Sequence, residues 1–200
     1  MPTIVLASQS TSRRRLLESA GLSPKIIVSN VDEETEFFNA MHPADMVIAL
    51  AITKAHTVRE QINFPAIIIG CDSTFEFDGV SLGKPGTPAI ATERAKRVRG
   101  NSGLLHTGHC IIDTDKGVEI ADRVTTKVTF SEMSEEEIED YIASGEPLHV
   151  AGGFTLDGHG SPFIPVIEGD YTNVVGISMP FLRNAMKQLG YSWPQVKEMS

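Results

Sequence analysis

Apolar residues in this chain form short runs in some segments and helical stripes in others, and the two kinds alternate along the sequence. Short or alternating apolar segments that are bounded by turn residues predict strands. These segments are Thr3–Ala7, Ile26–Ser29, Ala66–Ile69, the hairpin Phe75–Val80 with its Asp-Gly turn, and the long pair His106–Ile112 and Val118–Phe130. The glycine-rich stretch Gly152–Gly176 is expected to carry further short strands.

Helices are indicated by capping residues and by apolar residues at steps of three and four. They are predicted at Arg13–Ala20 before Gly21, from Pro43 to about Gln61, from Thr87 to Gly100, from the capping box at Ser134 to Gly145, and at Pro180–Leu189 before Gly190. Hairpins beside helical crossovers predict an α/β fold with a mixed sheet. Residues 1–200 are expected to form one domain, with two lobes around a cleft as an alternative division.

Composition narrows the class of protein. The chain has a formal net charge of −9 and 41% hydrophobic residues. A protein that binds polymeric nucleic acid needs a basic face, whereas a small nucleotide needs only a few local cations. No apolar run approaches the roughly 20 residues of a membrane span, and no basic leader precedes the apolar start. The two cysteines are too few for a disulfide scaffold, which favours a reduced, cytoplasmic setting.

Three arginines, Arg13, Arg14 and Arg15, begin the first predicted helix. A helix N-terminus carries a partial positive charge, so cations there are disfavoured unless an anion binds nearby. The preceding loop supplies hydroxyls and free backbone N–H groups, which together make a phosphate cradle. The alternative is that the arginines are solvated and that Ser10 or Ser12 simply caps the helix.

Lys54 falls inside the apolar stripe of the helix that begins at Pro43. It lies four residues after Leu50 and four residues before Val58. A lysine on a buried face needs an anionic partner, unless its ammonium group reaches solvent at the edge of the stripe.

Acidic residues supply candidate partners for such a cation. Asp72 follows the most apolar strand and a glycine, a position that commonly faces a cleft, although it can also cap a turn. Glu33 belongs to an acidic run that is either a solvated loop or, with Asp72, part of a Mg²⁺ site. Lys84 lies in a Gly-Lys-Pro-Gly loop that either aims its side chain or leaves it exposed.

Other reactive residues are weaker candidates. His106 and His109 are three positions apart in a strand and should point to opposite faces, which argues against a shared metal site. Cys71 has no evident histidine partner, so we interpret it as a small buried thiol. The chain contains neither of the glycine-rich phosphate-binding motifs of the P-loop and Rossmann folds.

Several segments carry a family resemblance in order along the chain. The first half contains L-A-S-Q-S-T-S-R-R at Leu6–Arg14, V-D-E at Val31–Glu33, K-A at Lys54–Ala55, G-C-D-S at Gly70–Ser73 and D-G-x-x-x-G-K-P at Asp78–Pro85. The second half contains Leu104–Gly108, Tyr141–Pro147, Ala151–Gly160 and Glu168–Gly176. Together these segments resemble the Maf, or septum-formation, family of nucleoside triphosphate pyrophosphatases.

The resemblance implies an elongated α/β fold with a central cleft, similar to that of inosine triphosphatases. It implies hydrolysis between the α- and β-phosphates of a nucleoside triphosphate, with Mg²⁺ or Mn²⁺, to clear non-standard or surplus nucleotides. Asp72 corresponds to the catalytic carboxylate and, with Glu33, to a metal ligand. The phosphate contacts correspond to Ser8, Arg13, Lys54 and Lys84. Family analogy also suggests a homodimer.

The sequence departs from the family pattern at three positions that help to select the base. Thr11-Ser12 replaces Pro-Arg, Ser73 replaces Thr, and Asp157 replaces Gln. A carboxylate accepts hydrogen bonds where an amide also donates them. We therefore expect Asp157 to contact an N–H-bearing base edge, such as that of guanine or a modified base, in place of the base of UTP or dTTP.

A function of another class is a non-enzymatic nucleotide sensor that binds a partner in cell division. Binding alone would not require both carboxylates, so the presence of Asp72 and Glu33 beside the lysines favours the enzyme. Comparing pyrophosphate release by the wild type and Asp72→Asn separates the two hypotheses.

Overall fold

Seven strands form one mixed sheet in the order β2-β1-β3-β5-β6-β7, with β4 paired to the far end of β3. The computed structural model describes residues 1–199. The strands are β1 (Thr3–Leu6), β2 (Lys25–Ile26), β3 (Ala66–Phe77), β4 (Val80–Leu82), β5 (Ser102–Asp113), β6 (Val118–Thr129) and β7 (Val166–Glu168). β1 is parallel to β2 and β3, and the other pairs are antiparallel, so the α/β class and the mixed sheet are confirmed.

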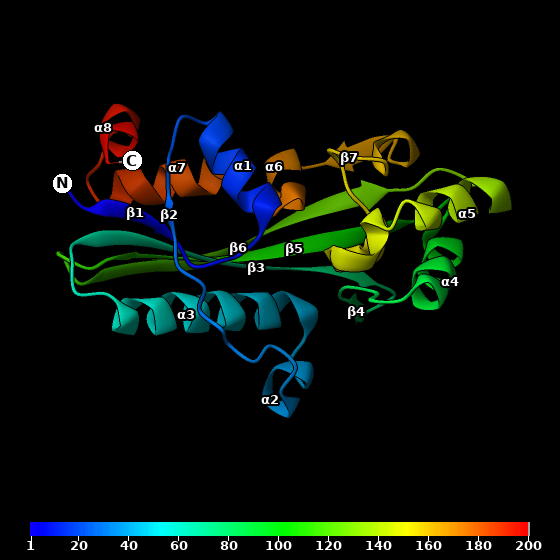
Figure 1. Ribbon diagram of the computed structural model, residues 1–200, viewed down its shortest axis with the longest axis horizontal. Helices are drawn as coiled ribbons and strands as arrows, with labels where there is room; N and C mark the ends of the chain where they lie inside the picture. The colour runs from blue at the N-terminus through cyan, green and yellow to red at the C-terminus, as the bar shows by residue number, and fades with distance from the viewer. Residues whose placement is uncertain (200) are drawn as a thin grey trace.

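Helices cover both faces of this sheet along its long axis (Figure 1). The α-helices are α1 (Thr11–Ser19), α2 (Glu36–Asn39), α3 (Pro43–Gln61), α4 (Pro88–Val98), α5 (Glu135–Ala143), α6 (Tyr171–Val175), α7 (Met179–Gln188) and α8 (Trp193–Glu198). In Figure 1, α3 lies below the sheet, α1, α6, α7 and α8 lie above it, and α4 and α5 flank its right-hand end. Short 3-10 turns occur at Glu146–His149, Ala151–Gly153 and Ser161–Phe163.

Successive side chains of the central strands point to opposite faces of the sheet, and on each face they form an apolar layer. Ile67 and Ile69 of β3 pack toward α7 and α8, whereas the intervening Ile68 packs toward α3. Each of these side chains is fully buried. This two-sided burial explains why the first part of β3 is apolar at every position.

Two glycines allow α3 to lie close against the sheet. A Cβ atom added at Gly70 would lie 2.4 Å from the carbonyl oxygen of Ala51, and one at Gly108 would lie 2.1 Å from that of Val47. Both carbonyls belong to the backbone of α3, which cannot move aside as a flexible side chain would. The position of α3, and therefore of Lys54, depends on these two glycines.

Gly108→Ala is expected to lower the free energy of unfolding by about 1–3 kcal/mol, because the added methyl group overpacks the contact with α3. Chemical denaturation of the purified variant measures the change. Gly83→Ala is the control, since a Cβ atom at Gly83 has no neighbour within 4 Å. A loss of stability that is equal in the two variants would contradict this explanation.

His109 is a buried histidine that packs the sheet against the start of α7. Its Nε2 accepts a hydrogen bond of 2.8 Å from the backbone N–H of Ser178, and its ring lies against Phe181 at 4.7 Å between centroids. Burial lowers the pKa of His109 to about 4, and the charge of Arg13 acts in the same direction. The imidazole is therefore neutral in the folded protein at neutral pH.

This burial makes stability dependent on pH. Above the unfolded-state pKa of about 6.5, His109 is neutral in both the folded and the unfolded protein, and the neutral side chain contributes fully to the free energy of unfolding. As pH falls from about 6.5 toward 4, only the unfolded state takes up the proton, which removes at most about 3 kcal/mol. Denaturant unfolding of wild type and His109→Gln across this range measures the loss. Parallel pH profiles for the two proteins would contradict the assignment.

Several predicted boundaries were wrong. The first helix begins at Thr11, two residues early, because the Ser10 side chain accepts a hydrogen bond from the Arg13 N–H and caps it. The strand predicted at Ala66–Ile69 continues to Phe77 and forms the first arm of the predicted hairpin, whose turn is Asp78-Gly79. The stretch Gly152–Gly176 contains only one short strand, β7, among turns and α6. Among residues 1–199, no helix combines the length and hydropathy needed to cross a bilayer.

Candidate active site

The candidate site surrounds the middle of β3, where one edge of the strand is not paired with any other described strand. β1 pairs with β3 from Ala66 to Ile69, and β4 pairs with it from Phe75 to Phe77. Between these two pairings, within residues 1–199, no strand pairs with that edge of β3. The other edge is paired with β5 from Ile67 to Glu76. Side chains from both faces of the sheet can therefore meet a ligand at this open edge.

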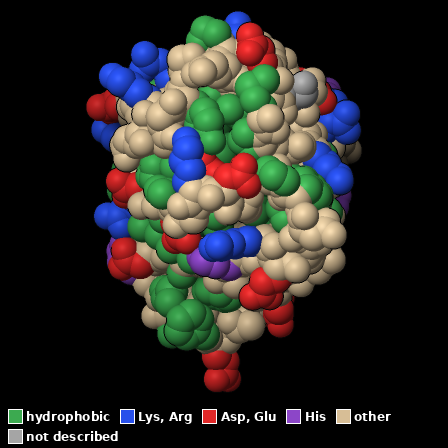
Figure 2. All heavy atoms as spheres, turned by 90° about the vertical axis from the view of Figure 1, so that its left-hand side faces the viewer, with side chains coloured by type: hydrophobic (Ala, Val, Ile, Leu, Met, Phe, Trp, Pro, Cys, Tyr) green, Lys and Arg blue, Asp and Glu red, His purple; other side chains and the backbone are tan. Residues whose placement is uncertain are grey.

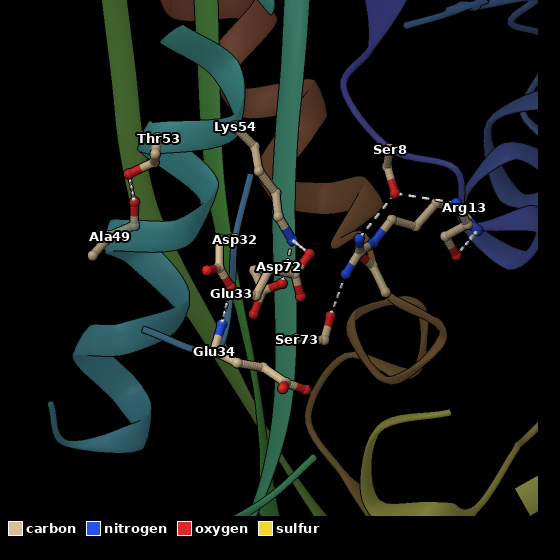
Figure 3. Close-up of polar contacts among 12 residues, drawn as sticks. Ser8, Arg13, Asp32, Glu33, Glu34, Ala49, Thr53, Lys54, Asp72 and Ser73 are labelled. Atoms are coloured by element: carbon tan, nitrogen blue, oxygen red, sulfur yellow. Dashed lines mark hydrogen bonds and ion pairs between the residues drawn. The ribbon is translucent and has the colours of Figure 1, made fainter. Parts of the chain in front are cut away.

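Asp72 lies in this open stretch and pairs with Lys54 of α3. The ammonium nitrogen of Lys54 lies 2.6 Å from Oδ1 of Asp72 and 2.7 Å from Oε1 of Glu33 (Figure 3). The Lys54 and Asp72 side chains are 7% and 10% exposed, whereas Glu33 is about half exposed. The lysine on the apolar stripe thus binds two anions, and the hypothesis that its ammonium group reaches solvent is wrong.

The environment of Asp72 favours a carboxyl group that can take up a proton. Burial raises the pKa of Asp72 above its ordinary value. The ammonium of Lys54 and the guanidinium of Arg13 oppose this rise without cancelling it. The expectation that Asp72 follows the end of a strand was wrong, since the strand continues past it. Among the described strands, one edge of β3 is unpaired at Asp72 because β1, which pairs with β3 as far as Ile69, ends at Leu6.

Arg13 approaches the same stretch of β3 from the opposite face of the sheet. Its guanidinium donates from Nε to the Gly176 carbonyl at 2.9 Å, from Nη1 to Ser8 Oγ at 3.2 Å and from Nη2 to Ser73 Oγ at 2.9 Å. Figure 3 shows Lys54 and Asp72 on one side of β3 and Arg13 with Ser73 on the other. Asp72 and Ser73 diverge because neighbouring strand residues point to opposite faces.

Of the three arginines at the start of α1, only Arg13 contributes to this group. Arg14 pairs with Glu18 at 2.7 Å on the surface, and Arg15 is exposed. Ser10 caps the helix, while Ser8 Oγ accepts from both the Ser10 N–H and Arg13. Because both of these contacts use oxygen lone pairs, the hydroxyl hydrogen of Ser8 is left to donate to a bound oxyanion.

Within the described residues, no side-chain hydrogen bond or ion pair joins three of the predicted site residues to this group. Lys84 is exposed in the loop after β4, where the Gly83 carbonyl accepts from Arg94. Asp157 is exposed between the 3-10 turns, and Ser12 is half-buried in the first turn of α1. Their roles stay predictions.

The second half of the chain supplies partners that sequence reasoning did not identify. Gly176 follows α6 and gives Arg13 its carbonyl acceptor. Thr107 of β5 is hydrogen-bonded to Ser73, and Ser73 is hydrogen-bonded to Arg13. Outside this group, Glu146 accepts hydrogen bonds from Thr155 and from the backbone of the turn that follows Asp157. Gly176 and Thr107 lie in segments that carry the family resemblance, which indicated that these segments matter. The sequence has no pattern that predicts the individual hydrogen bonds that they form.

The two carboxylates are suited to a hard divalent cation. Their oxygens lie within 2.7 Å of one shared position, which the ammonium nitrogen of Lys54 occupies. Among residues 1–199, no three His, Cys, Asp or Glu side chains gather as a ligand set. Mg²⁺ commonly binds through one or two carboxylates and completes its shell with water and substrate phosphates. Glu33 and Asp72 would therefore hold such an ion only together with a phosphate ligand.

In the described part of the chain, the end of the molecule where the N-terminus lies shows no second area of concentrated positive charge. Figure 2 shows acidic and basic side chains intermixed with apolar ones on that face, without a continuous basic area. A hollow of about 650 Å³ lies elsewhere, lined by residues of α1, α6 and α7 and by Trp193, and it includes none of the predicted site residues.

Known proteins are similar to this chain in sequence. The profile of the family described as Maf-like protein matches residues 3–189. A Streptomyces coelicolor protein named "Nucleoside triphosphate pyrophosphatase" is 49% identical over 188 residues, which cover 94% of this chain and 90% of the relative. Proteins of the same name from Prochlorococcus marinus and Synechocystis are 46% and 42% identical, covering 90% and 96% of this chain and 95% and 96% of those relatives. The chain that folds around this open strand edge belongs to the Maf-like protein family.

Proposed function

We propose that this protein hydrolyses a nucleoside triphosphate between its α- and β-phosphates and releases a nucleoside monophosphate and pyrophosphate. The observation that carries the proposal is the buried Lys54, bound to Asp72 and Glu33 at the open edge of β3, with Arg13 on the other side of the strand. The relatives named nucleoside triphosphate pyrophosphatase support the same activity.

The chemistry requires a base and cations, and both are present. Water attacks the α-phosphorus, its proton passes to the Asp72 carboxylate, and the bond from the α-phosphorus to the bridging oxygen breaks. Lys54, Arg13 and Lys84 stabilise the charge that builds up on the departing pyrophosphate. The hydroxyl group of Ser8 donates a hydrogen bond to a phosphate oxygen. A bound Mg²⁺ or Mn²⁺, held by Glu33 and Asp72, would neutralise phosphate charge.

A covalent intermediate is disfavoured by the state of the nearest thiol. Cys71 precedes Asp72 and is fully buried. Burial raises the pKa of Cys71 to about 11, so its thiol is protonated at neutral pH. The thiolate is the nucleophilic form, so Cys71 is a poor nucleophile here. Direct attack by water is the mechanism that these residues support.

Selection of the base is proposed to depend on the exposed Asp157. Its carboxylate accepts hydrogen bonds and would favour a base that presents N–H groups, such as guanine. Asp157→Asn should therefore reduce the preference for such a base by about 3- to 10-fold in kcat/KM, the worth of one hydrogen bond. A wild-type preference for UTP or dTTP would contradict this assignment.

A substrate panel tests the proposed function. The purified protein is incubated with each common and several modified nucleoside triphosphates, with Mg²⁺, with Mn²⁺ and with chelator, and pyrophosphate and orthophosphate are measured separately. The proposal predicts pyrophosphate release that needs the divalent ion. Release of orthophosphate alone, or no release above that of Asp72→Asn, would contradict it, and the latter result would favour the nucleotide sensor. Light scattering of the same sample tests the proposed homodimer.

A further inference from the structure

Thr107 is a buried residue of β5 that connects Arg13 to the α6 segment. Its Oγ1 lies 2.9 Å from Ser73 Oγ and 2.9 Å from the backbone carbonyl oxygen of Asn173. The Thr107 side chain is fully buried, and so is Asn173. Ser73 in turn accepts from Nη2 of Arg13 at 2.9 Å. Three consecutive hydrogen bonds therefore run from the site to the interior of the fold.

The direction of every bond in this chain follows from the donors available. A carbonyl oxygen only accepts, so the single hydroxyl hydrogen of Thr107 goes to Asn173. Thr107 can then only accept from Ser73, and Ser73 can only accept from Arg13. The hydroxyl hydrogen of Ser73 thus points away from the site and is not available to a nucleotide.

This arrangement fixes the orientation of the Arg13 guanidinium. A guanidinium carries five N–H groups, and three of them bind Gly176, Ser8 and Ser73. One N–H group remains on each of Nη1 and Nη2. Two N–H groups of one planar fork match two oxygens of a phosphate. A guanidinium that is already oriented loses less freedom when it binds that phosphate.

Gly176 anchors the other end of the Arg13 side chain. It has a φ of 125°, a left-handed conformation that other residues rarely adopt. A Cβ atom there would lie 3.1 Å from Nε and 3.2 Å from Cγ of Arg13. The α6 segment therefore contacts Arg13 through Gly176 and supports it through Asn173 and Thr107.

We propose that Thr107 is a positioning residue, which orients Arg13 through Ser73 for a bidentate contact with the polyphosphate. This inference rests on the proposed function for the identity of the ligand. Thr107 itself does not contact the substrate. Its hydroxyl determines how tightly polyphosphate binds, and the residue that it acts through is Arg13.

Two substitutions at Thr107 separate the hydroxyl from the side-chain volume. Thr107→Val removes the hydroxyl at nearly constant shape, whereas Thr107→Ser keeps it. We expect Thr107→Val to weaken the binding of inorganic pyrophosphate, in the presence of Mg²⁺ and measured by calorimetry, by about 3- to 10-fold. Thr107→Ser should bind within about twofold of the wild type. In turnover assays kcat/KM should fall by a similar factor, because Arg13 binds the phosphates in the transition state as well as in the ground state.

A double-mutant cycle with Arg13→Lys tests whether the effect passes through Arg13. Lysine lacks the planar fork, so Thr107→Val should change pyrophosphate affinity less than about twofold in that background. Equal fold-changes in both backgrounds, or an unchanged affinity in Thr107→Val, would overturn the inference. If Thr107→Val does not fold, Ser73→Ala breaks the same chain and should give the same weakening and the same cycle.

The binding assay keeps this inference separate from the proposed function. The wild type could bind pyrophosphate and hydrolyse no triphosphate, while Thr107→Val shows its smaller effect in the Arg13→Lys background. That result would overturn the proposed activity and support the role of Thr107. A wild type that does not bind pyrophosphate would overturn the role of Thr107.

Discussion

Replacing Asp72 by Asn is expected to reduce kcat at least about 100-fold, because general-base catalysis by a positioned carboxylate contributes about 10²- to 10⁴-fold. The amide keeps the shape of the side chain but does not take up the proton of the attacking water. Pyrophosphate release at saturating triphosphate and Mg²⁺ measures the effect.

The control for Asp72→Asn is Asp140→Asn, which makes the same chemical change at an exposed position of α5. It should leave kcat within about twofold of the wild type, as expected for a surface substitution away from the site. Thermal unfolding of Asp72→Asn shows whether the protein is folded when the rate is measured. A folded Asp72→Asn that retains more than about a tenth of wild-type kcat would contradict the catalytic assignment.

Replacing Lys54 by Met is expected to cost about 3–5 kcal/mol of stability, because it leaves the buried Asp72 without its cation. The Lys54 side chain is 7% exposed and the Asp72 side chain 10%, so solvent screens the pair little. Activity should also fall at least about 100-fold, since a phosphate ligand and the partner of the base are lost together. Denaturant unfolding and initial rates measure the two effects.

Two further variants identify the cause of that instability. Lys187→Met, at an exposed position in the last turn of α7, is the control for the chemical change and should alter stability by less than about 0.5 kcal/mol. The double variant Lys54→Met/Asp72→Asn removes the uncompensated charge and should recover part of the lost stability, while remaining inactive. Additive losses from the two single substitutions would show that the pair is not coupled as the structure indicates.

Local patterns in the sequence predicted much of the fold. The stripe from Val47 to Val58 and Pro43 as the first helical residue predicted α3, and the Asp78-Gly79 turn predicted the hairpin. The length of β3 was missed, because the three consecutive polar residues Asp72, Ser73 and Thr74 look like a loop until tertiary pairing with β5 is known. The segment after Gly152 was misassigned, because its glycines permit both turns and strands.

The candidate site was predictable where a residue conflicts with its local pattern. Lys54 stands on an apolar face, and the structure binds it to Asp72 and Glu33. Ser73 and Thr107 show no such conflict, because small hydroxyl residues are ordinary in strands. Their connection to Arg13 joins segments 60 and 34 residues apart, which only the folded sheet brings together.

The proposed site is tested most directly by a crystal structure of the protein with Mn²⁺ and a nucleotide in which the bridging oxygen between the α- and β-phosphates is replaced by a methylene group. We expect a triphosphate at the open edge of β3, within hydrogen-bond distance of Arg13 and Lys54, and an anomalous Mn²⁺ peak at coordination distance from a carboxylate oxygen of each of Glu33 and Asp72, beside the Lys54 ammonium group. Nucleotide bound elsewhere, for example in the hollow between α1 and α7, with none at Asp72, would contradict it.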